Sequence, residues 1–531
     1  MPQHPESPAA RSDSSLPAPH LHRPDALQHF RRLLSEAGFT EEGVCRRLGL
    51  DSIYDFRTLR GGRQGADEAA PGASSTELDG LGLLIHLFMD GEPMGRGRLE
   101  EGLGTEAVTA MEELRLLATH PAEREGLAAL ALVYPVAGLH IASDLNDDAP
   151  GASPDGGRLR TDAVYPALAG AVRGFLDDLP RTPCSRVLDL CAGTGVAALL
   201  SAPLAQEVWA LDITERATHF ARFNALLNGV NTLEARTGDL YDPLEGRRFD
   251  RIVAHPPYLP TVDPDLVFRD GGSDGEGVFR RIVEGLPHHL DSGGLFYGHG
   301  MATDRRERPL ETRLRGMLGP RHGEFDVYLA VSRTLTPQEF VLGRLRSGRA
   351  TVDEAARHLE ILDQLQVERF VRGSVLVERR SQVGSRRGDQ APITARRRRG
   401  RSGGWPDLEV LRGRERSAAR AARDGKVSEL RLRLTPGIGL STRYTVTEEG
   451  LAGQGVELTT DAPFHGTVRL PMEAGRLLPL FDGRRTVRQV RGKAIQEGIL
   501  PRDTPPGEFH GVVESLLRGG FLHLEGDDKE S

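Results

Sequence analysis

The chain has 531 residues, a length that suits about three domains. Its 68 lysines and arginines stand against 76 aspartates and glutamates, and the resulting net charge of -8 disfavours a surface that coats nucleic acid. Three widely spaced cysteines, Cys45, Cys184 and Cys191, argue against a disulfide framework, lack the spacing of metal ligands and favour a reducing cytoplasm.

The N-terminal part is predicted to be a tail followed by a helical domain. Residues 1–24 are rich in Pro, Ser, Ala and His without the apolar core of a secretion signal, so a disordered tail is expected. No stretch reaches the length of a membrane-spanning helix, so no membrane partner is expected. In residues 25–150, helical patterns between 26 and 117 precede strand-like alternation in 127–141. Helices followed by a hairpin predict a winged-helix-like domain that caps the protein or selects its substrate.

The central region, residues 155–378, begins with the pattern of a parallel α/β sheet. A short apolar run closed by Asp189 predicts a buried central strand. The strand is followed by a tight turn made of Ala192, Gly193, Thr194 and Gly195. Glycines let backbone N–H groups approach a ligand beside the positive end of the helix expected at 196–200. This turn is therefore predicted to be a cofactor loop.

Two acidic residues and an aromatic motif follow the turn in a specific order. The strand 207–211 ends in Asp212, where an acidic side chain can accept both hydroxyls of a ribose. Asp239 lies where a third strand ends and is a candidate for holding an adenine amino group. A fourth strand, 249–254, leads into His255-Pro256-Pro257-Tyr258. The candidate cofactor residues are Asp189, Ala192, Gly193, Thr194, Gly195, Asp212, Ile213, Asp239, Leu240 and His255.

This succession resembles the class I methyltransferases that use S-adenosylmethionine. Within them it is similar to the group with Asn-Pro-Pro-Tyr or Asp-Pro-Pro-Tyr after the fourth strand, which includes release-factor glutamine methyltransferases, adenine-N6 methyltransferases and small-domain rRNA methyltransferases. The block 269–275, Arg-Asp-Gly-Gly-Ser-Asp-Gly, resembles the glutamine branch. The resemblance covers about residues 160–335. It implies a doubly wound, Rossmann-like sheet of seven strands with S-adenosylmethionine as cofactor.

One position departs from the family pattern, because His255 stands where the family has Asn or Asp. The resemblance implies that this side chain and the following proline carbonyl accept hydrogen bonds from the target amine, while the aromatic ring stacks on the planar group. The candidate catalytic residues are therefore His255, Pro256, Pro257 and Tyr258. A neutral imidazole offers one acceptor and one donor, so His255 can mimic half of this arrangement. It can also serve as a general base, or mark an altered and weakened enzyme.

The last third of the chain changes character at an arginine-rich block, residues 379–404. Such a block repels itself and predicts a flexible linker. It also attracts phosphate groups, although the aromatic residues that base stacking requires are absent. Residues 405–531 alternate between strand and helix patterns and resemble small winged-helix modules that bind peptides or partner proteins. A basic recognition helix, which would favour DNA, is not evident.

The combined patterns predict a methyltransferase that transfers a methyl group from S-adenosylmethionine to a nitrogen of a macromolecule, either a protein side-chain amide or a nucleobase. The protein or nucleic-acid substrate is the expected partner. Two alternatives stay open at this point. One is O- or N-methylation of a small metabolite with His255 as the base, and the other is a non-catalytic scaffold that binds the cofactor. The acceptor and the oligomeric state are not predicted.

Overall fold

The computed structural model describes residues 19–56, 78–120, 126–144, 161–168, 170–258, 271–272, 274–347, 350–381, 391–401, 403–423, 426–448 and 450–524. The chain divides into two compact units. The first comprises Met1–Leu176, Pro180–Gly300 and Val352–Ile361, and the second comprises Asp177–Leu179, Met301–Thr351 and Leu362–Ser531. Among the described residues, no helix combines the length and the apolar character that crossing a membrane requires.

The first unit begins with the helical region that the sequence predicts. Its helices are α1 (Pro24–Glu36), α2 (Glu41–Leu48), α4 (Gly80–Leu84, continued by a π-helical turn at Ile85–Met89), α5 (Arg96–Leu103) and α6 (Thr105–Glu113). The break between α1 and α2 lies at Gly38, whose φ of 65° favours glycine, and Thr40 then caps α2 by accepting the Gly43 N–H. The apolar stripe of α1 is buried, as its periodicity predicts.

Short strands complete this region. The strands β1 (Met94–Gly95), β3 (Gly126–Ala129) and β2 (Leu117–Thr119) pair antiparallel, and β4 (Leu132–Val136) forms a hairpin with β5 (Leu139–Ser143). The expectation of a winged-helix-like domain stays a prediction.

The predicted disordered tail is wrong for its last residues. The His20 N–H donates to the Leu114 carbonyl at 2.8 Å, and a ring nitrogen of His219 lies 2.5 Å from the Pro19 carbonyl. These two contacts hold the backbone before α1 against later helices of the same unit. Residues 1–18 lie outside the described part of the chain.

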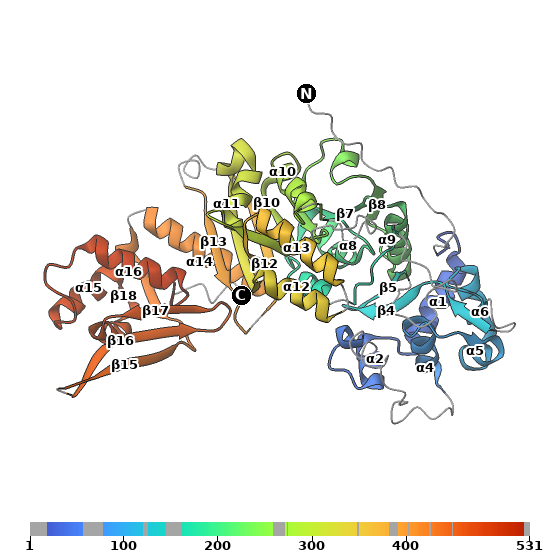
Figure 1. Ribbon diagram of the computed structural model, residues 1–531, viewed down its shortest axis with the longest axis horizontal. Helices are drawn as coiled ribbons and strands as arrows, with labels where there is room; N and C mark the ends of the chain where they lie inside the picture. Colours follow the sequence, from blue (N-terminus) through green and yellow to red (C-terminus); the bar gives the residue numbers. More distant parts are fainter. Residues whose placement is uncertain are drawn as a thin grey trace. The chain divides into compact units, whose positions relative to one another are not determined.

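Five parallel strands form the portion of the main sheet that lies in the first unit. They are β6 (Cys184–Leu190), β7 (Ala205–Asp212), β8 (Leu233–Thr237), β9 (Phe249–Ala254) and the beginning of β10 (Leu290–Arg305). The connecting helices are α7 (Gly170–Asp177), α8 (Val196–Ser201), α9 (Glu215–Asn228) and α10 (Gly277–His289). Helix α9 packs against β7 and β8 (Figure 1). The central strands are buried, which explains why they appear in the sequence as short apolar runs.

The second unit adds further strands to this sheet. Strand β11 (Phe325–Leu335) pairs antiparallel with β12 (Val367–Arg379) and parallel with β13 (Thr394–Arg398). Helices α11 (Leu310–Met317), α12 (Pro337–Arg346) and α13 (Val352–Gln364) connect these strands. Within the described residues the strand order is β13-β11-β12-β10-β9-β6-β7-β8. The sheet therefore has eight strands in this part of the chain, where the sequence predicts seven.

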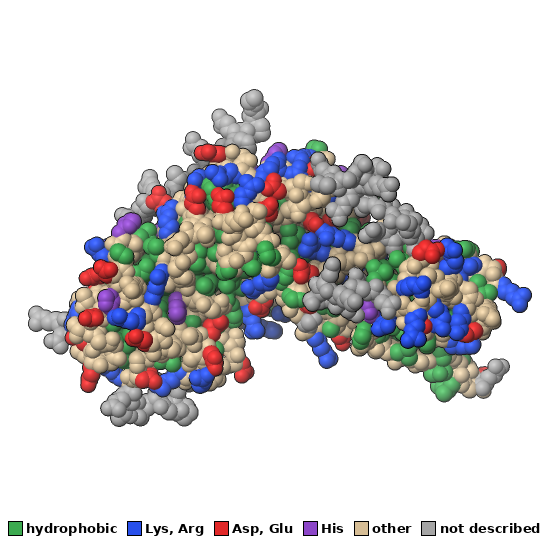
Figure 2. Space-filling model, turned by 180° about the vertical axis from the view of Figure 1, so that it is seen from behind, with side chains coloured by type: hydrophobic (Ala, Val, Ile, Leu, Met, Phe, Trp, Pro, Cys, Tyr) green, Lys and Arg blue, Asp and Glu red, His purple; other side chains and the backbone are tan. Residues whose placement is uncertain are grey.

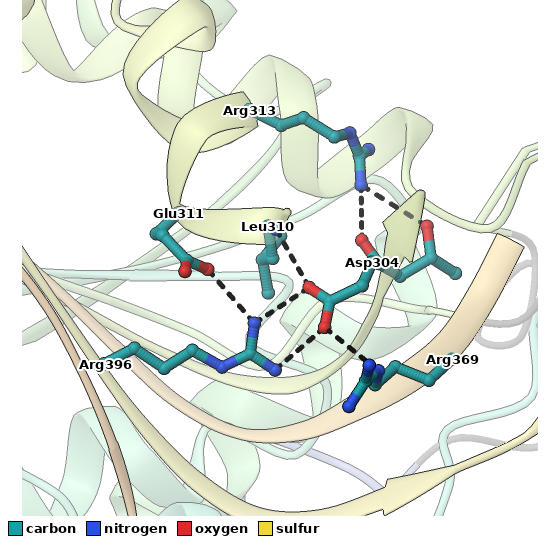
Figure 3. Close-up of polar contacts among 7 residues, drawn as sticks. Asp304, Leu310, Glu311, Arg313, Arg369 and Arg396 are labelled. Atoms are coloured by element: carbon teal, nitrogen blue, oxygen red, sulfur yellow. Dashed lines mark hydrogen bonds and ion pairs between the residues drawn. The ribbon is translucent and has the colours of Figure 1, made fainter. Parts of the chain in front are cut away.

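Strand β13 also corrects the prediction of a flexible linker over residues 379–404. Its main chain pairs with β11, and its arginines contact acidic groups instead of repelling one another. Figure 3 shows Arg396 facing Asp304. The two terminal nitrogens of its guanidinium each donate to one carboxylate oxygen of Asp304, both at 2.9 Å. Neighbouring arginines pair with Glu415 and Asp178. Distant acids therefore neutralise the charge that predicts disorder; residues 382–390 lie outside the described part.

The rest of the second unit has its own core. Its helices are α14 (Trp405–Arg423), α15 (Val487–Gln496) and α16 (Pro506–Arg518). One sheet has the order β18 (Asp482–Thr486), β14 (Arg431–Leu434), β19 (Leu522–Leu524), and another has the order β15 (Gly439–Thr447), β16 (Gly450–Thr460), β17 (Gly466–Leu470). A cluster of buried apolar side chains from these elements packs together. The winged-helix-like character of this region stays a prediction, and α14 was not anticipated from the sequence.

Candidate functional site

The carboxyl ends of four strands meet at one edge of the sheet. Leu190 at the end of β6 pairs with Leu211 on one side and with Ala254 on the other, and Asp212 pairs with Thr237. The residues that follow these positions therefore emerge side by side. Strand β6 is also where the order reverses, since β7 and β8 extend to one side and β9 and β10 to the other. Parallel α/β sheets bind ligands at such a reversal.

The turn after β6 has the backbone that its glycines predict. Gly193 and Gly195 have φ angles of 52° and 76°. A Cβ on Gly195 would lie 2.9 Å from the Cβ of Ala221, so α9 requires a glycine here. A Cβ on Gly193 would meet no atom of the described residues within 4 Å, so this face of the turn is open. The Thr194 carbonyl accepts from the Asn224 side chain at 2.9 Å. The turn is thus held in place and leaves a cradle at Gly193.

Two carboxylates support this turn. Asp189 is 2% exposed and accepts the Ala198 N–H at 3.0 Å, and burial raises its pKa to about 8. Asp212 accepts the Gly193 N–H at 2.9 Å and the Thr214 N–H at 3.1 Å. Burial raises the pKa of Asp212, and these hydrogen bonds oppose the shift. Its Oδ1 also accepts the Thr214 hydroxyl at 3.3 Å, whereas Oδ2 accepts only the Gly193 N–H among the described residues and keeps a lone pair for a ligand hydroxyl.

Asp239 emerges beside Asp212, because the Gly238 N–H donates to the Asp212 carbonyl at 2.9 Å. Its carboxylate receives two hydrogen bonds from Arg281 on α10, at 3.1 and 3.0 Å. Sequence reasoning did not assign a role to Arg281, which is 42 positions away, and only the packing of α10 brings it here. Leu240 is 8% exposed and Ile213 is 50% exposed.

His255 follows β9 directly and lies next to the turn. Its Nδ1 is 2.9 Å from the His299 carbonyl, which can only accept, so Nδ1 carries the proton. In the neutral ring Nε2 then holds the lone pair. The Phe175 ring stacks on the imidazole with centroids 5.1 Å apart, and the Tyr258 ring meets it edge-on at 5.9 Å. Pro256 is buried, and Pro257 and Tyr258 are partly buried.

Three residues missed as site members complete the surroundings of His255. Phe175 on α7 stacks on Tyr297 as well, with centroids 5.4 Å apart, and the Tyr297 hydroxyl donates to the Phe175 carbonyl at 2.9 Å. The His299 carbonyl orients the imidazole of His255. The sequence could have indicated His299 if β9 and β10 had been aligned as parallel neighbours. Their register pairs Gly298 with Ala254 and so places His299 beside His255.

Comparison with known proteins identifies the region that contains this site. Residues 169–315 match the family model of the methyltransferase small domain. This region belongs to that family. We call residues 169–315 the methyltransferase domain.

Curated relatives share the methyltransferase domain with this chain. The ribosomal protein uL3 glutamine methyltransferase of Bradyrhizobium diazoefficiens is 40% identical over 138 residues, which are 23% of this chain and 42% of the relative. The release factor glutamine methyltransferase of Xylella fastidiosa is 40% identical over 129 residues, 22% of this chain and 46% of the relative. The chain thus spans less than half the length of these two relatives.

Solved structures include more distant similarities. The ribosomal protein L11 methylase of Lactobacillus delbrueckii subsp. bulgaricus is 17% identical with a TM-score of 0.24, covering 40% of this chain and 77% of that one. An rRNA methylase of Streptococcus thermophilus is 16% identical with a TM-score of 0.22, covering 40% and 93%.

The cofactor of this methyltransferase family is S-adenosylmethionine. The geometry of the methyltransferase domain fits such a molecule. A Cβ would fill the open face of Gly193, and Asp212 points its carboxylate at the same turn. Asp239 stands next to Asp212 at the same edge of the sheet. A compact cradle with two carboxylates suits a ligand that carries a ribose and an amino-substituted base.

Proposed function

We propose that the chain transfers a methyl group from S-adenosylmethionine to a nitrogen of a macromolecule, with a glutamine side-chain amide of a protein as the preferred acceptor. The observation that carries this proposal is the position of His255. It lies beside the glycine turn, with its proton on Nδ1 and its lone pair on Nε2. The names of the relatives, which methylate glutamine in release factors and in ribosomal protein uL3, support an amide acceptor.

In this proposal Asp212 accepts the ribose hydroxyls of the cofactor, and Asp239, held by Arg281, lies at the adenine. The cofactor supplies an electrophilic methyl group when it is bound. The chain itself contributes positioning, since alignment of the reacting atoms can lower a barrier by several kcal/mol without a strong base.

His255 orients the acceptor in this proposal. Its Nε2 accepts a hydrogen bond from the acceptor N–H, which aligns the nitrogen lone pair with the methyl group. Stacking on Phe175 and the hydrogen bond to the His299 carbonyl hold the imidazole plane in one orientation. The Tyr258 ring packs beside Gly300, where an added Cβ would lie 3.2 Å from a ring carbon. In this proposal the ring offers a face for a planar amide.

The same hydrogen bond supports a second candidate, methylation of a small-molecule hydroxyl or amine with His255 as general base. A carbonyl that accepts a hydrogen bond from Nδ1–H makes Nε2 more basic and directs it toward a substrate. The two functions differ in what they require of the side chain. Positioning requires a polar group of suitable geometry, whereas base catalysis requires a group that takes a proton.

The test is transfer of radiolabelled methyl from S-adenosylmethionine into an extract of cells that lack this protein. The products are divided by protease, nuclease and a small-molecule filter. For an amide acceptor we expect protease to release the label, and we expect His255→Asn to keep turnover within about tenfold, because an amide also positions through hydrogen bonds. His86→Asn, at a half-exposed site outside the methyltransferase domain, is the matched control.

Other outcomes contradict the proposal in distinct ways. Label that passes the filter, together with loss of turnover in His255→Asn, indicates a metabolite acceptor and base catalysis. Release of the label by nuclease indicates a nucleobase. If no fraction is labelled although calorimetry shows cofactor binding, the domain is a scaffold that binds the cofactor without catalysis.

A further inference from the structure

A cavity of about 420 Å³ lies within the second unit, far along the chain from the methyltransferase domain. Its wall combines β13, α14, α16 and the segment that leads into β17; the lining residues that matter here are Arg397, Arg414, Phe464, Ser515, Arg518 and Phe521. Pockets of 300–1,000 Å³ are typical of small-molecule sites. Figure 2 shows Lys and Arg side chains gathered on the face of this C-terminal region, at the right of the view.

The charges around the cavity do not balance. Three guanidinium groups line it, from Arg397, Arg414 and Arg518. Glu415, which is 2% exposed, pairs with Arg397 and lies 3.9 Å from Arg518. The lining histidine, His465, is itself 2.7 Å from the carboxylate of Asp461. Asp407, which is 7% exposed, is a second carboxylate close enough to Arg414 to act on its charge. Two carboxylates therefore face three arginines, and the wall keeps an excess of about one positive charge.

Arg414 is the arginine of this wall for which the described residues provide no direct hydrogen-bond or ion-pair partner. Among the described residues its guanidinium makes no hydrogen bond and no ion pair, and the side chain is partly buried. Burial lowers the pKa of Arg414, the nearby charge of Arg397 lowers it further, and the charge of Asp407 opposes the shift. A partly desolvated cation without a hydrogen-bonded anion costs free energy, which a bound anion would offset.

A glycine, Gly520, leaves space for the guanidinium of Arg414. Gly520 has a φ of 79°, and a Cβ there would lie 2.2 Å from an Arg414 terminal nitrogen and 2.9 Å from its Cζ. The glycine therefore lets the fork of Arg414 lie flat against the backbone between α16 and β19. Phe464 and Phe521 also line the cavity, so part of its wall is apolar.

We propose that this cavity binds a small phosphate monoester, with the phosphate on Arg414 and its neighbouring arginines and an apolar or aromatic body against Phe464 and Phe521. A phosphate monoester carries a charge of about -1.5 to -2 near neutral pH, which is enough to neutralise the excess of the wall. Guanidinium forks bind phosphate oxygens through paired hydrogen bonds. A phosphate monoester offers three terminal oxygens to the three arginines, whereas a monocarboxylate offers two. This site is independent of the proposed methyl transfer.

The experiment uses the full chain with phenyl phosphate as the probe and benzoate as the carboxylate of the same body. Binding is measured by titration calorimetry at constant ionic strength, and the melting temperature is followed in parallel. We expect phenyl phosphate to bind the wild type at least tenfold more tightly than benzoate. We expect Arg414→Gln to weaken phenyl phosphate binding at least tenfold.

Arg488→Gln is the matched control, since it removes the same charge from the same unit at a side chain that is 71% exposed and lies outside the cavity. It should bind phenyl phosphate like the wild type. The melting temperature without probe separates binding from folding. Because Arg414 has no direct partner among the described residues, Arg414→Gln should melt no lower than the wild type. Equal binding by Arg414→Gln, equal affinity for benzoate, or no binding by the wild type would overturn the proposal.

Discussion

Asp189 shows how burial sets the chemistry of a single residue at the glycine turn. Its carboxyl is 2% exposed, and the one N–H it accepts, from Ala198, offsets only part of the desolvation that raises its pKa to about 8. At neutral pH the folded chain therefore holds a proton on Asp189 that the unfolded chain releases. The neighbouring Cys191 thiol is also kept protonated, since burial and the adjacent carboxylates raise its pKa well above the ordinary value.

Because the folded chain holds this proton at neutral pH, we expect the free energy of unfolding to depend on pH. The pKa of Asp189 is higher in the folded chain than in the unfolded chain, so its stabilising contribution is fully present below about pH 4. This contribution is lost as the pH rises toward 8, by at most about 1.4 kcal/mol per pH unit. Asp189→Asn, which can still accept the Ala198 N–H, removes this dependence. The melting temperature of the variant should rise relative to the wild type between pH 5 and pH 8. A constant difference over that range would show that Asp189 is ionised in the fold.

Asp212 carries the second prediction at the residue scale. If its carboxylate accepts ribose hydroxyls, Asp212→Asn removes charge-assisted hydrogen bonds that contribute about 1.5 to 3 kcal/mol. We expect calorimetry to report at least a tenfold loss of affinity for S-adenosylmethionine. Asp242→Asn, an exposed acid three residues after Asp239, is the control and should bind normally. Unchanged affinity in Asp212→Asn would remove the ribose assignment.

Strand β13 illustrates the element scale, because its arginines tie it to other elements. Arg396 contacts Asp304 at the end of β10 and Glu311 on α11. Asp304, which is 6% exposed, also accepts the Leu310 N–H at 3.0 Å and lies 3.8 Å from Arg369 on β12. Figure 3 shows these side chains converging on Asp304. One buried carboxylate thus connects two strands and a helix to β13.

The third prediction tests this connection. Asp304→Asn leaves the Arg396 guanidinium partly buried without its main anion, so we expect the free energy of unfolding to fall by about 3 kcal/mol. Unfolding in urea is followed by the fluorescence of Trp405, which lies in the same unit, in a Trp209→Phe background. Arg488→Gln breaks an exposed pair with Glu429 and should cost less than about 1 kcal/mol. Equal small losses in both variants would mean that β13 is held by its main-chain pairing alone.

At the scale of the whole molecule, the two proposed ligands use different units. The residues around the glycine turn and His255 belong to the first unit, and the lining of the arginine cavity belongs to the second. A chain built in this way should show two separate sets of protected amides. Backbone amides that contact a ligand, or that lie in a turn it stabilises, exchange more slowly when it is bound.

Hydrogen exchange with mass spectrometry on the full chain supplies the fourth prediction. S-adenosylmethionine should slow exchange in residues 191–196, 212–214 and 237–240, and phenyl phosphate should slow it in residues 464–468 and 515–521. Each ligand alone should leave the other set unchanged, and the Asp212→Asn and Arg414→Gln variants should each lose one set. Protection by S-adenosylmethionine confined to the second unit would contradict the cofactor site.

The sequence by itself determined the local features of the methyltransferase domain. A strand closed by Asp189, the glycines at 193 and 195, the acid at 212 and the motif that begins at His255 are each specified by neighbouring residues, because turn geometry and strand periodicity are short-range properties. Their order along the chain was sufficient to predict a parallel sheet and its cofactor edge.

Only the tertiary structure decided which distant groups complete these features. The Phe175 ring on His255, the His299 carbonyl, and Arg281 on Asp239 depend on the packing of helices and on strand register. The arginine block gave the clearest error. Its composition predicts a linker, yet Arg396 meets Asp304 across 92 positions and β13 becomes an eighth strand. The density of charge is a property of neighbouring residues in the sequence, whereas the acids that neutralise this charge are brought close only by the fold.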